Sequence, residues 1–157
     1  GWALLDAESR PEVDFVGDIR DLSAFRDESC AEVYASHVLE HVPPQDILPV
    51  LNGIHRILVP GGSLYLSVPD LDTLVWLFSS PILNKAEKFH VMRIMFGGQM
   101  DEHDLHRIGL NFDFLTDYLG DVGFSSLEHV ESFGLFADTS EMVVAGHRIS
   151  LNLIVIK

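Results

Sequence analysis

The order of hydrophobic and polar residues along the chain predicts an alternation of strands and helices. Short apolar runs over 2–6, 13–18 and 31–36 are separated by polar, turn-forming residues, and each run is typical of a strand. A fourth run over 63–68 lies between a pair of glycines and Pro69. Runs of this length and boundary predict four strands in the first half of the chain.

A helix is predicted between the third and fourth strands. Apolar residues recur there at three- and four-residue steps from Ile47 to Leu58, which is the pattern of a helix with one apolar face. Asp46 is the predicted N-cap, and Pro49 falls in the first turn, where its missing N–H is tolerated. The length of this strand–helix–strand unit permits parallel pairing, so the sequence predicts α/β organisation.

The second half of the chain continues the same alternation. Asp70 is the predicted N-cap of the first of three further helices, and glycines follow the second and third. The predicted helices cover 71–78, 85–96 and 112–119, and the predicted strands cover 126–132 and 149–156.

Composition limits the classes of function. At 157 residues and 17.5 kDa the chain is expected to form one domain over 1–157, and it has no run near the roughly 20 apolar residues of a membrane span. The net charge of −14, from 24 acidic and 10 basic residues, would repel phosphate backbones, so we expect no nucleic-acid partner. The single cysteine, Cys30, excludes an internal disulfide and favours a reducing compartment, the cytoplasm.

Three phrases carry a family resemblance. They are GDIRDLSAF at 17–25, YASHVLEHVP at 34–43 and HRILVPGGSLYLSVPD at 55–70. The chain resembles small bacterial class I S-adenosylmethionine-dependent methyltransferases, in which a Leu-x-Pro-Gly-Gly turn leads into the fifth strand. The segment 100–124 is similar to the region that follows. The resemblance implies a Rossmann-like α/β fold, a doubly wound and mostly parallel sheet with helices on both faces, and methyl transfer from S-adenosylmethionine to an unidentified small acceptor.

The ends of the predicted strands hold the candidate cofactor residues, because ligands of open α/β sheets bind beyond the carboxyl ends of the strands. The resemblance implies that Asp6 accepts hydrogen bonds from the ribose hydroxyls, that Asp18 and Ile19 hold adenine, and that Ser36 and His37 border the sulfonium. For each aspartate the alternative is a local turn or cap role, since Asp readily bonds nearby main chain.

The family's first strand and its glycine-rich turn should lie before Gly1, because the sequence contains no G-x-G-x-x-G after a strand. We therefore expect an N-terminally truncated domain, lacking a strand that normally lies in the middle of the sheet. Residues 2–6 fill the gap, a second chain pairs there as a homodimer, or the protein extends upstream. The first two outcomes would weaken or abolish cofactor binding, and they favour the alternative of a non-catalytic binding or scaffold domain.

His37, Glu40 and His41 form the pattern H-x-x-E-H at the mouth of the expected site. In the methyltransferase interpretation His41 or His37 is a general base on a substrate hydroxyl or amine, and Glu40 orients it. Local capping or pairing is the alternative for Glu40 and His41. A metallohydrolase reading needs a continuous helix and a third ligand, but Pro43 and Pro44 leave barely one turn, so no metal site is predicted.

A second polar cluster precedes the predicted helix over 112–119. It contains two histidines among acidic residues and is expected either to line a substrate pocket or to form a solvated loop. Its members are Asp101, Glu102, His103, Asp104 and His106.

Overall fold

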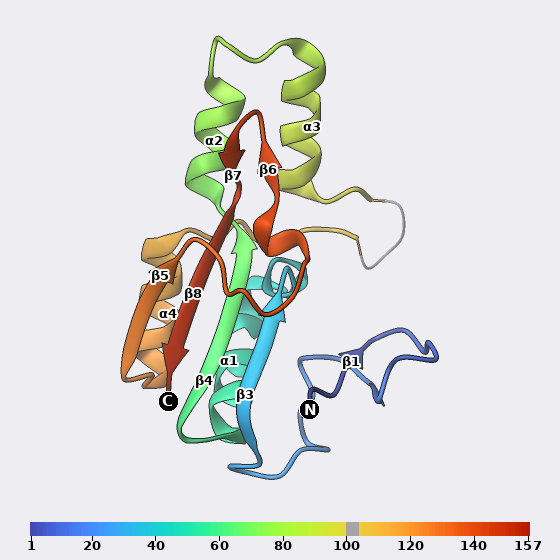
Figure 1. Ribbon diagram of the computed structural model, residues 1–157, viewed down its shortest axis with the longest axis vertical. Helices are drawn as coiled ribbons and strands as arrows, with labels where there is room; N and C mark the ends of the chain where they lie inside the picture. Colours follow the sequence, from blue (N-terminus) through green and yellow to red (C-terminus); the bar gives the residue numbers. More distant parts are fainter. Residues whose placement is uncertain (100–103) are drawn as a thin grey trace.

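The computed structural model describes residues 1–99 and 104–157, and it contains one four-stranded sheet (Figure 1). In spatial order the strands are β3 (Cys30–Ser36), β4 (Leu58–Pro69), β8 (Ser150–Ile156) and β5 (Ser126–Val130). The β3–β4 pair is parallel, whereas β8 is antiparallel to both of its neighbours. The sheet is therefore mixed, and the expectation of a mostly parallel sheet is wrong because the closing strand enters between β4 and β5 in the opposite direction.

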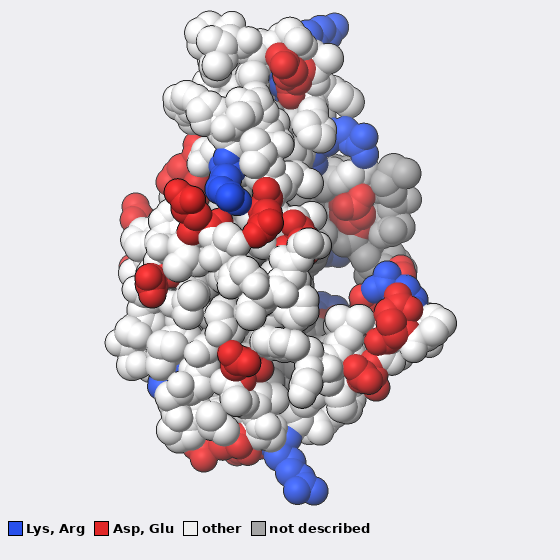
Figure 2. All heavy atoms as spheres, in the orientation of Figure 1, with Lys and Arg blue, Asp and Glu red and all other residues white. Residues whose placement is uncertain are grey.

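The first two strands form a separate, small parallel sheet. These strands are β1 (Leu5–Asp6) and β2 (Phe15–Val16), both much shorter than the predicted runs. Within the described part of the chain β1 pairs only with β2, and β3 pairs only with β4, so residues 2–6 do not fill a place beside β3. Figure 2 shows the surface hollowed between this N-terminal segment and the body of the molecule.

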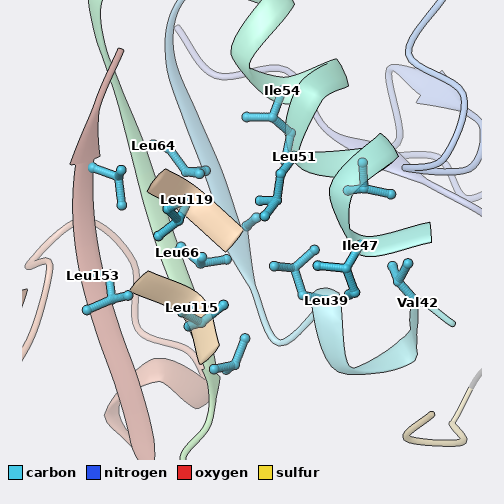
Figure 3. Packing of buried hydrophobic residues seen from close by; sticks show 14 of the residues in the cluster. Leu39, Val42, Ile47, Leu51, Ile54, Leu64, Leu66, Leu115, Leu119 and Leu153 are labelled. Carbon is cyan, nitrogen blue, oxygen red and sulfur yellow. The ribbon is translucent and has the colours of Figure 1, made fainter. Parts of the chain in front are cut away.

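One face of the main sheet carries the larger apolar core. Helix α1 (Ile47–Ile57) and helix α4 (Phe112–Val122) both lie on this face (Figure 1). The side chains from the two helices meet those of the sheet in Figure 3. The fully buried residues at this contact include Leu51, Ile54, Leu64, Leu66, Leu115, Leu119 and Leu153. The 3.6-residue periodicity of α1 thus predicted its buried face correctly.

The opposite face is covered by irregular chain rather than by helices. The segment 131–142, which contains the short 3-10 helix η3 (Thr139–Glu141), crosses this face in front of β3 and β4 (Figure 1). Tyr34 contacts Phe136 edge to face at 4.8 Å and Phe133 at 5.5 Å between ring centroids. The expected helical cover on both faces is therefore wrong for the described residues, because an aromatic loop occupies the second face.

A helical hairpin extends beyond the carboxyl ends of β3 and β4. Its helices are α2 (Leu71–Ser79) and α3 (Lys85–Phe96), and a two-stranded ribbon of β6 (Val143–Val144) and β7 (His147–Arg148) lies beside it. The hairpin has its own apolar cluster, which includes Leu74, Leu77 and Val91. Asp70 caps α2 as predicted, with its carboxylate accepting from the Asp72 amide. No helix among the described residues is long and apolar enough to cross a membrane.

Several predicted boundaries move, most of all those next to glycines. Strand β4 begins at Leu58 rather than at Ser63, because the Pro-Gly-Gly turn is itself bent into the sheet with a register shift opposite β3. A side chain at Gly62 would lie 2.9 Å from the Ala31 carbonyl oxygen, so the close approach of the two strands requires glycine there. Helix α4 continues through Gly120 to Val122, and its C-cap is Gly123, which has φ 98°.

Candidate functional site

The candidate site lies where β3 ends. The chain turns at His37, whose φ of 53° is in the left-handed region, and then forms the 3-10 helix η1 (Leu39–His41). A second 3-10 helix, η2 (Pro44–Asp46), leads directly into α1. The H-x-x-E-H residues therefore lie on a tight turn rather than on a continuous helix, as the two prolines predicted.

Glu40 is the most unusual side chain of this turn. It is only 2% exposed, and neither carboxylate oxygen has a hydrogen-bond partner among the described residues. Its Oε1 lies 3.4 Å from His37 Nδ1, which is ion-pair distance, but the orientation is not that of a hydrogen bond. Burial raises the pKa of Glu40 to about 8, because an ionised carboxylate is poorly solvated there.

His37 is held by the C-terminal part of the chain. Its Nε2 lies 2.9 Å from Ser150 Oγ, and that hydroxyl donates its proton to the Thr139 carbonyl oxygen at 2.9 Å. Since the serine proton is used, Nε2 is the donor to Ser150, and Nδ1 carries the lone pair that faces Glu40. Burial lowers the pKa of His37 to about 4, so the imidazole is neutral at neutral pH.

His41 and His106 meet above the same turn. Their rings contact edge to face at 4.8 Å, and His41 Nδ1 lies 3.2 Å from the Leu105 carbonyl oxygen. A carbonyl only accepts, so Nδ1 of His41 carries the proton and Nε2 carries the lone pair. Burial lowers the pKa of His106, and the neighbouring His41 lowers it further.

Main-chain hydrogen bonds place His106 next to Glu40. The Arg107 amide donates to the Glu40 carbonyl oxygen at 2.7 Å, and the His106 amide donates to Phe96 at 3.2 Å. Ligand-type atoms of Glu40, His41 and His106 lie within 4.8 Å of one another. A cavity of about 10 Å³ adjoins this group and is lined by Glu40, Pro69, Leu71, Leu74, Met95, His106, Ile108 and Gly109. Of the predicted polar cluster, residues 101–103 lie outside the described residues.

The two candidate cofactor aspartates lie at one end of the small parallel sheet. Asp6 ends β1, and its carboxylate accepts from the Glu8 amide at 2.9 Å and pairs with Arg10. Asp18 follows β2, accepts from the Arg20 amide at 2.8 Å and is bridged by Nε of the same arginine. Both carboxylates therefore have the local turn role that the sequence left open, and a ligand would share or replace the arginine contacts.

The remaining cofactor candidates differ in setting. Ile19 is partly buried against the main core. Ser36 ends β3, and its Oγ is buried without a hydrogen bond of good geometry. The Ser36 hydroxyl is nevertheless close to the Asp138 carboxylate. Burial alone would raise the pKa of Asp138, but hydrogen bonds from Ser140 and Tyr34, together with the nearby Ser36 hydroxyl, lower it below its usual value. The Ser36 hydroxyl therefore lies beside the side chains of Tyr34 and Asp138.

Sequence reasoning missed the contribution of the C-terminal third. Asp138, Thr139 and Ser150 reach the site only because β8 inserts beside β4 and segment 131–142 folds back over β3. Tyr34 OH donates to Asp138 at 2.8 Å across 104 residues of chain. The one local signal is Asp138 itself, which caps η3 by accepting from the Ser140 amide.

Comparisons with known proteins agree with this layout. Residues 3–66 match the family model described as a methyltransferase domain, whereas no curated protein matches the chain in sequence. An S-adenosylmethionine-dependent methyltransferase from Archaeoglobus fulgidus has a similar structure, with TM-score 0.56, 14% identity, and coverage of 93% of this chain and 67% of that one.

Two further solved structures are similar. A possible histamine N-methyltransferase from Thermotoga maritima has TM-score 0.56 and 14% identity, with 93% of this chain and 65% of that chain covered. Human N-acetylserotonin methyltransferase in complex with S-adenosylmethionine has TM-score 0.54 and 12% identity, with 96% of this chain and 35% of that chain covered. The chain thus spans between 35% and 67% of the length of these three neighbours.

The strand order and the structural neighbours define a Rossmann-like fold of the methyltransferase type. The match to the methyltransferase-domain model covers residues 3–66, and S-adenosylmethionine-dependent methyltransferases are among the proteins that share this fold.

Proposed function

We propose that this chain contributes to methyl transfer from S-adenosylmethionine to a small acceptor, at the carboxyl ends of β1, β2 and β3. The observation that carries the proposal is the Ser36 hydroxyl, which is buried at the end of β3 without a hydrogen bond of good geometry. In open α/β folds this edge is where ligands bind. The bound cofactor supplies an electrophilic methyl group, and the residues of this chain supply binding and proton acceptance.

The residues at this edge fit the adenosine part of the cofactor. Asp6 accepts from the two ribose hydroxyls, since one carboxylate has two oxygens for two donors. Asp18 accepts from the adenine amino group, with Ile19 against the ring. Each carboxylate exchanges an exposed arginine partner for the ligand, and exposed ion pairs of this kind are worth only about 0–1 kcal/mol. Ser36 borders the sulfonium.

We assign the removal of a proton from the acceptor to His37, Glu40 and His41 in the η1 turn. The proton acceptors are the lone pairs at His41 Nε2 and His37 Nδ1, and Glu40 orients His37 at 3.4 Å. The low pKa of His37 makes it a weak base near neutral pH, which favours His41 for this role.

The proposal extends to partners and location. The acceptor is a small molecule, because the charge of −14 disfavours nucleic acid, and no membrane partner is invoked. The lone cysteine favours the cytoplasm. Among the described residues β3 pairs only with β4, so its other edge allows a second copy to pair there as a homodimer, which size-exclusion chromatography with light scattering would detect.

Isothermal titration with S-adenosylhomocysteine tests the proposal. We expect saturable binding to the unaltered chain and a loss of at least about tenfold in affinity for Asp18→Ala. The matched control is Asp21→Ala, an exposed carboxylate three residues beyond Asp18 that accepts from the Ser23 amide. Equal affinity of Asp18→Ala and Asp21→Ala would remove Asp18 from the site.

A non-catalytic binding or scaffold domain is the second candidate. It is favoured by the arginine pairs that already occupy Asp6 and Asp18 and by the absence of a G-x-G-x-x-G segment from the sequence. No binding of S-adenosylhomocysteine by the folded chain would favour this candidate. A metallohydrolase on His37, Glu40 and His41 is not supported, because His37 is not part of the group of close ligand atoms among the described residues.

A further inference from the structure

Three side chains above the η1 turn form a group that the sequence did not predict. Glu40 and His41 come from η1, whereas His106 comes from the loop between α3 and α4, 66 positions beyond Glu40. We propose that Glu40, His41 and His106 bind one divalent transition-metal ion, for which zinc is the reference. Two imidazoles and one carboxylate are a common protein ligand set for such ions, which leaves one coordination position open.

The Glu40 carboxylate is the strongest argument for an occupant. A buried carboxylate without hydrogen bonds is costly, because its desolvation is not compensated. Here both oxygens are buried and have no hydrogen-bond partner among the described residues, and the adjoining cavity of about 10 Å³ is lined by Glu40 and His106. A space of this size holds a single water or ion. A metal ion would supply the contacts that both oxygens lack in the described part of the chain.

The histidines are oriented as metal ligands usually are. A ligating histidine typically donates its other ring N–H to a carbonyl or carboxylate, which fixes the ring and its tautomer. His41 Nδ1 donates to the Leu105 carbonyl oxygen at 3.2 Å, so its Nε2 lone pair is left for the metal. Leu105 directly precedes His106 in the same loop, so one short segment supplies both a ligand and the support of another.

The spacing requires a small closure. Ligand atoms around a tetrahedral zinc ion lie about 3.3 Å apart, given bonds of about 2.0–2.2 Å. The three ligand atoms here lie within 4.8 Å of one another, so the widest pair closes by up to about 1.5 Å on binding. His106 can supply this movement, since its ring is only partly buried, while the Arg107 amide keeps its loop attached to Glu40 at 2.7 Å.

Metal binding does not depend on the proposed methyl transfer, although any role of the ion in the reaction rests on that proposed function. With an ion bound, His41 is a ligand rather than a base, and the acceptor oxygen takes the open position. An ion there would lower the pKa of an acceptor hydroxyl placed at the open position. The ion also ties the loop that carries His106 to the η1 turn, so it should stabilise the folded chain.

Zinc titration of chelator-treated, untagged protein tests the inference. We expect one equivalent of Zn²⁺ to bind saturably and to raise Tm, and we expect His41→Ala, His106→Ala and Glu40→Gln each to lose at least about tenfold in affinity. The control is His90→Ala, an exposed histidine on α3 that should bind like the unaltered chain. Circular dichroism verifies that each variant is folded, and His106→Gln replaces any unfolded alanine variant at that position.

Cobalt provides a second readout. Co²⁺ bound by two imidazoles and a carboxylate should give visible absorption bands that disappear in His106→Ala and persist in His90→Ala. Absence of saturable binding, or equal affinity of the ligand variants and His90→Ala, would overturn the metal site. Because these experiments contain no S-adenosylhomocysteine, their failure is separate from failure of the proposed function.

Discussion

Asn152 holds the irregular cover of the second sheet face, and its removal should loosen that cover. It is the one amide in the otherwise hydrophobic centre of β8 and is only 1% exposed. Its Nδ2 donates to the carbonyl oxygens of Glu131 and Ser140, both at 3.0 Å. These bonds attach segment 131–142 to the sheet at two points.

The expected cost of Asn152→Ala is about 2–4 kcal/mol in the free energy of unfolding. Each hydrogen bond contributes on the order of 1 kcal/mol net, and an unpaired buried carbonyl costs about 1–3 kcal/mol. Ser140 is 2% exposed, so its carbonyl is poorly placed to bond water instead. A partial offset arises because Asn152 Oδ1 is itself buried without a partner, and the substitution removes it.

Urea unfolding monitored by circular dichroism measures this effect. With a slope of about 1–3 kcal/mol per molar urea, the midpoint should fall by roughly 1–2 M. Limited proteolysis should at the same time cut within 131–142 sooner than in the unaltered chain. Asn52→Ala is the control, since the bond from Asn52 to the Leu48 carbonyl lies on an exposed helix turn and should change stability by no more than about 0.5 kcal/mol. Equal midpoints for the two variants would refute the role of Asn152.

Three further substitutions test other parts of the fold. Leu51→Ala should lower the free energy of unfolding in urea by about 2–5 kcal/mol, because Leu51 is fully buried between α1 and the sheet. A smaller loss than that of Leu135→Ala, at an exposed leucine, would contradict this packing. Asp70→Ala should lower the unfolding free energy by about 1 kcal/mol through loss of the α2 cap, and an unchanged midpoint would show the cap to be dispensable. Gly97→Ala should lower Tm and also weaken zinc binding. Gly97 has φ 81°, and an added Cβ would clash with the Asp104 carbonyl in the loop that carries His106. Unchanged zinc affinity would show that this loop does not belong to the metal site.

The elements that sequence reasoning predicted well are those with local causes. The apolar period of α1 predicted both its helix and its buried face, and Asp70 predicted the start of α2. Helix α3 has the predicted bounds of Lys85–Phe96, with Asn84 completing a capping box. In each case residues within one or two turns decide the outcome, so the pattern is readable without knowledge of the tertiary fold.

The errors concern contacts between distant segments. An apolar run such as Ser150–Ile156 predicts a buried strand but not its direction, so the antiparallel entry of β8 was not foreseen. The same holds for the candidate site. Glu40 and His41 were found through their spacing, but His106 was assigned to a separate cluster, because only the folding of its loop onto η1 brings them together.

The most direct test of the central claim is an amide ¹H–¹⁵N spectrum of the chain titrated with S-adenosylhomocysteine. The account predicts saturable shifts concentrated at Asp6, Asp18, Ile19 and Ser36, the residues at the carboxyl ends of β1, β2 and β3. No saturable shift from the folded chain, or shifts confined to other parts of the molecule, would contradict the claim that this edge holds the cofactor.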